Sequence, residues 1–147
     1  MKLYLDTSAL NRIFDDRSQV RIALEALAMQ SILLLIQDQK VQLITSDALS
    51  YEVSRNPYAE RKAVIMGILQ LASVHQPFTN DILIRAQQLE KIDKIGKLDA
   101  FHIACAEYQV ADVFITCDDR LIKRYQGSLQ LCNPVNFTLE RTKPEES

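Results

Sequence analysis

The sequence predicts an α/β fold in which a mainly parallel sheet carries helices on both faces. Short apolar runs alternate with segments whose apolar residues recur at helical spacing, which is typical of βαβ units. Two of these runs end at acidic residues. Leu3–Leu5 is followed directly by Asp6, and Val113–Thr116 is followed after one residue by Asp118 and Asp119. Because ligands bind at the carboxyl ends of parallel strands, these acids mark the predicted site.

Five segments are predicted as strands because they are short, apolar and bounded by turn or helix-start residues. Pro134 restricts the last of them to an edge of the sheet. The predicted strands are Leu3–Leu5, Val41–Ile44, Val74–Phe78, Val113–Thr116 and Leu129–Phe137. Helical spacing predicts helices over about 20–40, 47–55, 58–72, 79–91, 99–110 and 119–125.

Two of the predicted helices bear on function. In the first, Val20, Leu24, Leu27 and Leu34 form an apolar stripe, and further apolar residues extend round the helix. That helix is therefore either deeply buried or the site of a subunit contact. In the helix at 99–110, Asp99 heads the row of Ile103, Ala106 and Val110, so its carboxylate is expected to point inward.

Composition limits the classes of function. A chain of 147 residues suggests one domain, predicted over 1–141 and followed by a polar tail at 142–147. A net charge of −2 confines nucleic-acid contacts to local basic patches. Three glycines are too few and too dispersed for a phosphate-binding loop or a dinucleotide fingerprint, so no nucleotide cofactor is expected. The longest apolar run, Ile32–Ile36, is too short to span a membrane.

Cysteine usage favours the cytoplasm. The three cysteines form no CxxC pair and have apolar or small neighbours, as buried free thiols in a reducing compartment do. We therefore expect a cytoplasmic protein.

Four acids are candidates for one site: Asp6, Glu52, Asp99 and Asp118. Each alone has an ordinary explanation, as a helix cap or a solvated helix residue. If they converge to about 5 Å, each pair repels by roughly 3 kcal/mol at an effective dielectric of about 20. A divalent cation would relieve that repulsion, and all-oxygen sites suit Mg²⁺ or Mn²⁺.

Such a cation can assist the attack of water on a phosphodiester. The sequence offers no arrangement of Ser, His and Asp, or of Cys and His, that favours acyl transfer. His102 is expected to flank the site or to pack on the sheet.

Four stretches together resemble the PIN-domain ribonucleases, and especially the short VapC-like toxins of bacterial toxin–antitoxin pairs. They are LYLDTSALNRIF, ITSDALSYEV, KLDAFHIACA and FITCDDRL, and they span almost the whole chain. The resemblance makes Asp6, Glu52, Asp99 and Asp118 the catalytic and metal-binding acids. Asp118 is chosen over the adjacent Asp119 because it completes a Thr-x-Asp pattern. The supporting residues are Thr7, Ser8, Ser46, Thr116 and Asp119.

The resemblance implies a three-layer α/β/α sandwich with a five-stranded, mainly parallel sheet. It also implies Mg²⁺- or Mn²⁺-dependent cleavage of RNA, frequent dimerisation and a small antitoxin partner. Candidate RNA-binding residues are Arg12, Arg17, Lys91, Lys94 and Lys97, for which a solvated charged face is an equally good explanation.

Two other functions remain open. A non-catalytic PIN-like module that binds RNA or protein would have no use for four mutually repelling acids. A receiver-like signalling domain needs an acidic pair after its first strand, whereas Asp6 stands alone there.

Overall fold

The computed structural model describes residues 1–141, and within them five strands form one parallel sheet in the order β3-β2-β1-β4-β5. The predicted α/β class and parallel sheet are confirmed. The strands are β1 (Lys2–Leu5), β2 (Gln42–Ser46), β3 (Val74–Gln76), β4 (Val113–Ile115) and β5 (Gln130–Cys132). The polar tail predicted at 142–147 lies outside the described residues.

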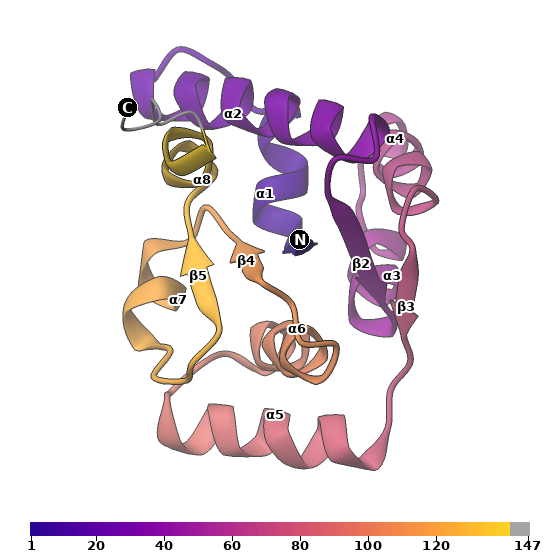
Figure 1. The fold of residues 1–147 in the computed structure, drawn as a ribbon, viewed down its shortest axis with the longest axis vertical. Helices are drawn as coiled ribbons and strands as arrows, with labels where there is room; N and C mark the ends of the chain where they lie inside the picture. Colours follow the sequence, from indigo (N-terminus) through magenta and orange to yellow (C-terminus); the bar gives the residue numbers. More distant parts are fainter. Residues whose placement is uncertain (142–147) are drawn as a thin grey trace, which may run out of the picture.

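Helices connect successive strands and cover both faces of the sheet. Right-handed crossovers place the connections from β1 to β2 and from β2 to β3 on one face, and the later connections on the other. Figure 1 shows the sheet between α2 and α5, with α8 beside α2. The helices are α1 (Thr7–Asn11), the 3₁₀ helix η1 (Arg12–Phe14), α2 (Val20–Gln37), α3 (Asp47–Ser54), α4 (Ala59–Leu69), α5 (Asn80–Ile92), α6 (Lys97–Tyr108), α7 (Asp119–Arg124) and α8 (Pro134–Arg141).

The central strand β1 lies between β2 and β4 and is fully buried over its last three residues. Leu5 is in register with Ile115, so the ends of β1 and β4 are neighbours. The ring of Tyr4 stacks on that of Phe114, with centroids 5.2 Å apart and planes 6° apart. The chain turns to opposite faces after β1 and β4, which makes this edge the topological switch point where α/β proteins bind ligands.

Two predicted elements are corrected by the structure. The strand predicted over Leu129–Phe137 ends at Cys132, and Pro134 is the first residue of α8. Proline is well suited to that position because its fixed φ is helical and its missing N–H would be unpaired. Val110 is not part of the inward row on α6, because the helix ends at Tyr108 and Val110 is exposed with a φ of 54°.

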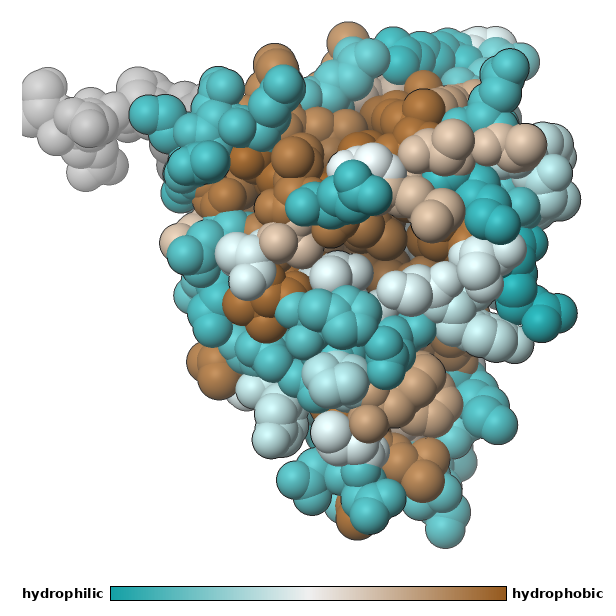
Figure 2. Space-filling model, turned by 90° about the vertical axis from the view of Figure 1, so that its right-hand side faces the viewer, coloured by the Kyte–Doolittle hydropathy of each residue, from teal (hydrophilic) through white to brown (hydrophobic). Residues whose placement is uncertain are grey.

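Helix α2 is only partly buried. Ala26, Met29 and Ile32 face the core, whereas the predicted stripe that contains Leu27 and Leu34 is more than half exposed. The alternative of a deeply buried helix is therefore wrong. Figure 2 shows apolar side chains gathered in the upper part of the face over α2 and α4. By length and composition α2 could cross a membrane, but core helices of soluble proteins also pass that test.

Candidate functional site

Asp6 ends β1 and caps the following helix. Its side chain is 3% exposed, and Oδ1 accepts hydrogen bonds from the Ser8 hydroxyl (2.6 Å) and the Ala9 amide (2.9 Å). Burial raises the pKa of Asp6, and hydrogen bonds from Ser8 and Thr116 oppose that rise. The carboxylate is thus held at the sheet edge by local donors.

The ends of β1 and β4 are joined through hydroxyl groups. Thr116 is fully buried, and its Oγ1 lies 3.2 Å from the Ser8 hydroxyl and accepts the Asp118 amide at 3.1 Å. Asp118 caps α7, where its Oδ1 accepts the amides of Arg120 and Leu121. Ser8 and Thr116 therefore fix the positions of the two acids that follow these strands.

Glu52 reaches the same edge from α3. That helix begins after Ser46, whose Oγ accepts the Leu49 amide at 3.1 Å. Glu52 Oε1 accepts the Thr7 hydroxyl and lies 3.2 Å from His102 Nε2. Burial alone would raise the pKa of Glu52, but these two hydrogen bonds outweigh it and lower the pKa.

Asp99 lies in the first turn of α6 and is half-buried. Within residues 1–141 its carboxylate has no hydrogen-bond partner. Burial, followed by the charge of Asp6, raises the pKa of Asp99 to about 6, with smaller contributions from Glu52 and Asp118. The four predicted acids are therefore close enough to influence one another electrostatically.

The donor set fits a hard divalent cation in its chemistry. In residues 1–141 no three His, Cys, Asp or Glu side chains already form a group that could hold a metal. The oxygens of Asp6, Glu52 and Asp118 are turned toward hydroxyl, imidazole or amide donors. All four acids offer oxygen ligands, and a cation would offset the repulsion that raises the pKa of Asp99.

Asp119 is directed away from the other acids. Its two oxygens accept hydrogen bonds from Arg21 Nη1 and Nη2 at 2.8 and 2.7 Å. The Arg21 guanidinium lowers the pKa of Asp119. The charge of Asp118 is among the causes that raise the pKa of Asp99.

The basic residues predicted to bind RNA differ in whether their side chains are already engaged within the protein. Arg12 contacts Asp15 at 2.9 Å and the buried Glu25 at 3.1 Å, so it supports α1 and α2 and is not free for RNA. Arg17 Nη2 donates to the Ile13 carbonyl at 3.3 Å. The side chains of Lys91, Lys94 and Lys97 are exposed and form no ion pair within the described residues.

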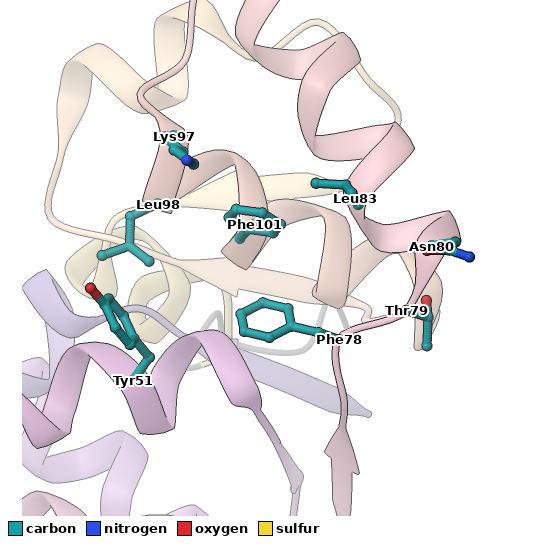
Figure 3. A pocket seen from close by; sticks show the side chains of 8 residues that line it. All are labelled: Tyr51, Phe78, Thr79, Asn80, Leu83, Lys97, Leu98 and Phe101. Carbon is teal, nitrogen blue, oxygen red and sulfur yellow. The ribbon is translucent and has the colours of Figure 1, made fainter.

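A groove of about 740 Å³ is lined by residues of α3, α5 and α6 and of the segment after β3. Figure 3 shows Tyr51 and Leu98 pointing toward each other at one end, and Phe78 and Phe101 facing each other in the middle. The two phenyl rings are 5.2 Å apart and T-shaped. Tyr51 precedes Glu52 and Leu98 precedes Asp99, so two of the lining residues are sequence neighbours of the acids. Its lining comprises Tyr51, Phe78, Thr79, Asn80, Leu83, Lys97, Leu98 and Phe101.

The sequence interpretation missed Tyr4, which was assigned only to an apolar strand. Its hydroxyl lies 2.6 Å from Ser46 Oγ and 2.7 Å from His102 Nδ1, in the fully buried space behind Glu52. A tyrosine in a strand buried on both faces must find a partner for its hydroxyl, and that requirement was the available signal.

Comparisons with known proteins agree with the fold. The profile of the PIN domain matches residues 3–127. None of the curated proteins compared with the chain matches it. The fold is similar to that of FitAcB from Neisseria gonorrhoeae, with a TM-score of 0.60, 20% identity, and coverage of 90% of this chain and 97% of that one.

Two further solved structures are similar. VapBC-1 from nontypeable Haemophilus influenzae gives a TM-score of 0.61 at 18% identity, covering 91% of this chain and 98% of that one. VapBC2 from Rickettsia felis was solved bound to a DNA fragment from its promoter. It gives a TM-score of 0.58 at 18% identity, covering 90% of this chain and 98% of that one. At these identities the likeness concerns the fold.

Proposed function

Because the chain belongs to the PIN domain family, we propose that it is a Mg²⁺- or Mn²⁺-dependent endoribonuclease acting as a VapC-like toxin. Members of the family are generally nucleases, which supports hydrolysis of a nucleic acid. We propose RNA as the substrate and a divalent cation as the cofactor.

One observation carries the proposal: the charges of Asp6, Glu52 and Asp118 all raise the pKa of Asp99. The four residues come from the ends of β1 and β4 and from α3 and α6, and a structural role would not require acids from four separate elements to act on one carboxylate. Mutual repulsion of this kind is characteristic of sites that bind cations or transfer protons.

In the proposed reaction the four carboxylates hold the cation. A bound Mg²⁺ or Mn²⁺ would lower the pKa of the attacking water and stabilise the charge on the leaving oxygen. Glu52 is kept ionised by Thr7 and His102 and so remains a ligand below neutral pH. One of the acids, or a hydroxide held by the cation, would take the proton of the attacking water.

The test is RNA cleavage by the wild type, Asp6→Asn and Asp99→Asn, with Mn²⁺ and with a chelator. Both variants keep the size of the side chain and remove one anionic ligand, so we expect folded proteins without cleavage. Asp38→Asn, at the exposed end of α2, is the matched control and should cleave as the wild type does. Metal-dependent cleavage retained by both site variants would refute the assignment.

We further propose a small antitoxin partner, a segment of which enters the acidic edge. The solved structures named VapBC and FitAcB support this partner by analogy of fold. The apolar groove lined by Tyr51 and Leu98 offers contact area at residues adjacent in sequence to two of the acids. A small protein should copurify with the chain from its own host, and its removal after denaturation and refolding should increase RNA cleavage. Unchanged cleavage would contradict inhibition by that protein.

A homodimer is the other proposed assembly. Leu34 on α2 and Met66 on α4 are exposed apolar residues, and Figure 2 shows apolar side chains gathered over these two helices. Burying such a face is favourable. Sedimentation should give twice the chain mass, and Leu34→Glu should give a monomer. A wild type that sediments as a monomer at high concentration would refute self-association.

The non-catalytic alternative predicts no dependence of stability on divalent cations. For the nuclease, millimolar Mn²⁺ should raise the melting temperature of the wild type by linkage. The receiver-like alternative conflicts with family membership. We propose a cytoplasmic location, which the free thiols of Cys105, Cys117 and Cys132 support.

A further inference from the structure

Behind the acidic edge lies a buried chain of hydrogen bonds that ends on Glu52. Tyr4, Ser46 and His102 are each 0% exposed. Tyr4 Oη lies 2.6 Å from Ser46 Oγ and 2.7 Å from His102 Nδ1, and His102 Nε2 lies 3.2 Å from Glu52 Oε1. The hydrogen bond between Tyr4 and His102 joins residues 98 positions apart, on β1 and α6.

The positions of the protons in this chain follow from the available acceptors. An ionised carboxylate can only accept hydrogen bonds. His102 Nε2 therefore carries a proton and donates a hydrogen bond to Glu52. In the neutral imidazole Nδ1 is then an acceptor, and the Tyr4 hydroxyl donates to it. Ser46 accepts the Leu49 amide and donates to Tyr4 Oη. Every donor in the chain thereby has an oxygen or nitrogen acceptor.

The opposite arrangement is poorer. If Tyr4 donated to Ser46, the Ser46 proton would be left with the thiol of Cys105, which is a weak acceptor. His102 would then need protons on both nitrogens, and a charged imidazole would be fully buried.

The Tyr4 side chain is held rigidly. Its ring stacks on Phe114 with planes 6° apart and meets His102 edge-on with centroids 5.8 Å apart. The fixed ring holds the hydroxyl oxygen within hydrogen-bond distance of His102 Nδ1. The hydroxyl can therefore select one tautomer of the imidazole, as the partners of metal-bound histidines do.

We propose that Tyr4 is a positioning residue that fixes the Nε2–H tautomer of His102 and thereby holds Glu52 in the orientation required for cation binding. This inference rests on the proposed function. Tyr4 touches neither cation nor RNA, and it acts through the imidazole. Because outer partners of metal ligands typically contribute 10- to 100-fold to metal affinity, loss of the hydroxyl should raise the half-saturating Mn²⁺ concentration about 10-fold.

The first measurement is the tautomer itself, read by long-range proton–nitrogen correlation NMR. The chain has only two histidines, and His75→Gln assigns the remaining signal to His102. The wild type should show His102 with a proton on Nε2 and none on Nδ1. Tyr4→Phe, which keeps the stacked ring, should give a mixture of tautomers. An Nδ1–H or doubly protonated His102 in the wild type would overturn the inference.

The second measurement is the Mn²⁺ dependence of RNA cleavage. Tyr4→Phe should raise the half-saturating Mn²⁺ concentration without changing KM for RNA. The matched control is Tyr125→Phe, which removes a part-buried hydroxyl that donates to Glu107 at 2.5 Å, and it should leave the Mn²⁺ dependence unchanged. Equal Mn²⁺ dependence in Tyr4→Phe and the wild type would overturn the inference.

A double-mutant cycle tests whether Tyr4 acts through His102. The side-chain amide of His102→Gln can still donate to Glu52 but no longer depends on Tyr4, so adding Tyr4→Phe should have no further effect on Mn²⁺ dependence. Additive effects would contradict action through the imidazole. If the wild type does not cleave RNA at all, the nuclease proposal fails. The NMR comparison still decides whether Tyr4 orients His102.

Discussion

Replacing Asp99 by Asn should stabilise the protein at neutral pH while abolishing activity. The pKa of Asp99 is raised from 3.8 to about 6, so the folded state favours its protonated form. Between these two values the folded protein binds more protons than the unfolded one, and stability falls as the pH rises through that window. Above that pH window the folded protein bears the whole loss of stability, because the ionised carboxylate of Asp99 is half-buried among like charges.

The size of the effect follows from the shift in pKa. A rise from 3.8 to about 6 corresponds to about 3 kcal/mol at 1.36 kcal/mol per pKa unit. Partial exposure of Asp99 screens the charges and reduces this to about 1.5–3 kcal/mol. In a domain of this size that gives a rise in melting temperature of about 3–12 °C for Asp99→Asn.

The assay is urea unfolding of the wild type and Asp99→Asn in a chelator, from about pH 4 to about pH 7.5. The variant should match the wild type at the acidic end and exceed it at neutral pH. Asp38→Asn, at an exposed position, should show no such dependence on pH. A difference between Asp99→Asn and the wild type that is constant with pH would refute the reasoning. With Mn²⁺ in place of the chelator, the wild type should regain stability and the variant should not.

Three other predictions follow from the contacts around the site. Asp118→Asn should abolish RNA cleavage whereas Asp119→Asn should not, because Asp119 is paired with Arg21; equal losses in a cleavage assay would contradict this. Glu25→Ala should lower the free energy of unfolding in urea by about 3–5 kcal/mol, because it leaves Arg12 without its buried partner. An effect below about 1 kcal/mol would show that this pair is solvent-screened. Thr7→Val should raise the pKa of Glu52, because it removes a hydrogen bond to the carboxylate; an NMR titration of the Glu52 carboxyl in a chelator that matches the wild type would exclude a role for the Thr7 hydroxyl.

The parallel sheet was predictable because each strand carries its own local pattern. Leu3–Leu5 and Val113–Thr116 are apolar runs that stop at acids, and the rules of α/β connections bring such ends to one edge. The last strand was misjudged at Pro134. A proline that excludes a central strand equally suits the first turn of a helix, and only the packing of α8 on α2 decides between them.

Long-range pairing was the part that local patterns could not supply. Arg12 has the positive charge expected of an RNA contact. It is instead paired with Glu25, which becomes buried only when α2 packs on η1. Asp119 is likewise engaged by Arg21, which is distant in sequence. The roles assigned to the four acids stay predictions. The structure adds their electrostatic proximity and the chain from Tyr4 through His102 to Glu52.

The site concentrates its energetic cost on one residue. Asp6 and Asp118 each cap a helix, and Glu52 accepts two hydrogen bonds, so three of the four charges are compensated by local donors. Asp99 has no hydrogen bond among residues 1–141, and its pKa is raised by burial and then by the charges of the other three acids. A fold that compensated Asp99 as well would be more stable and would bind a cation less strongly, because a ligand must first leave its existing partners. The instability at Asp99 is therefore the structural counterpart of the proposed affinity for a divalent cation.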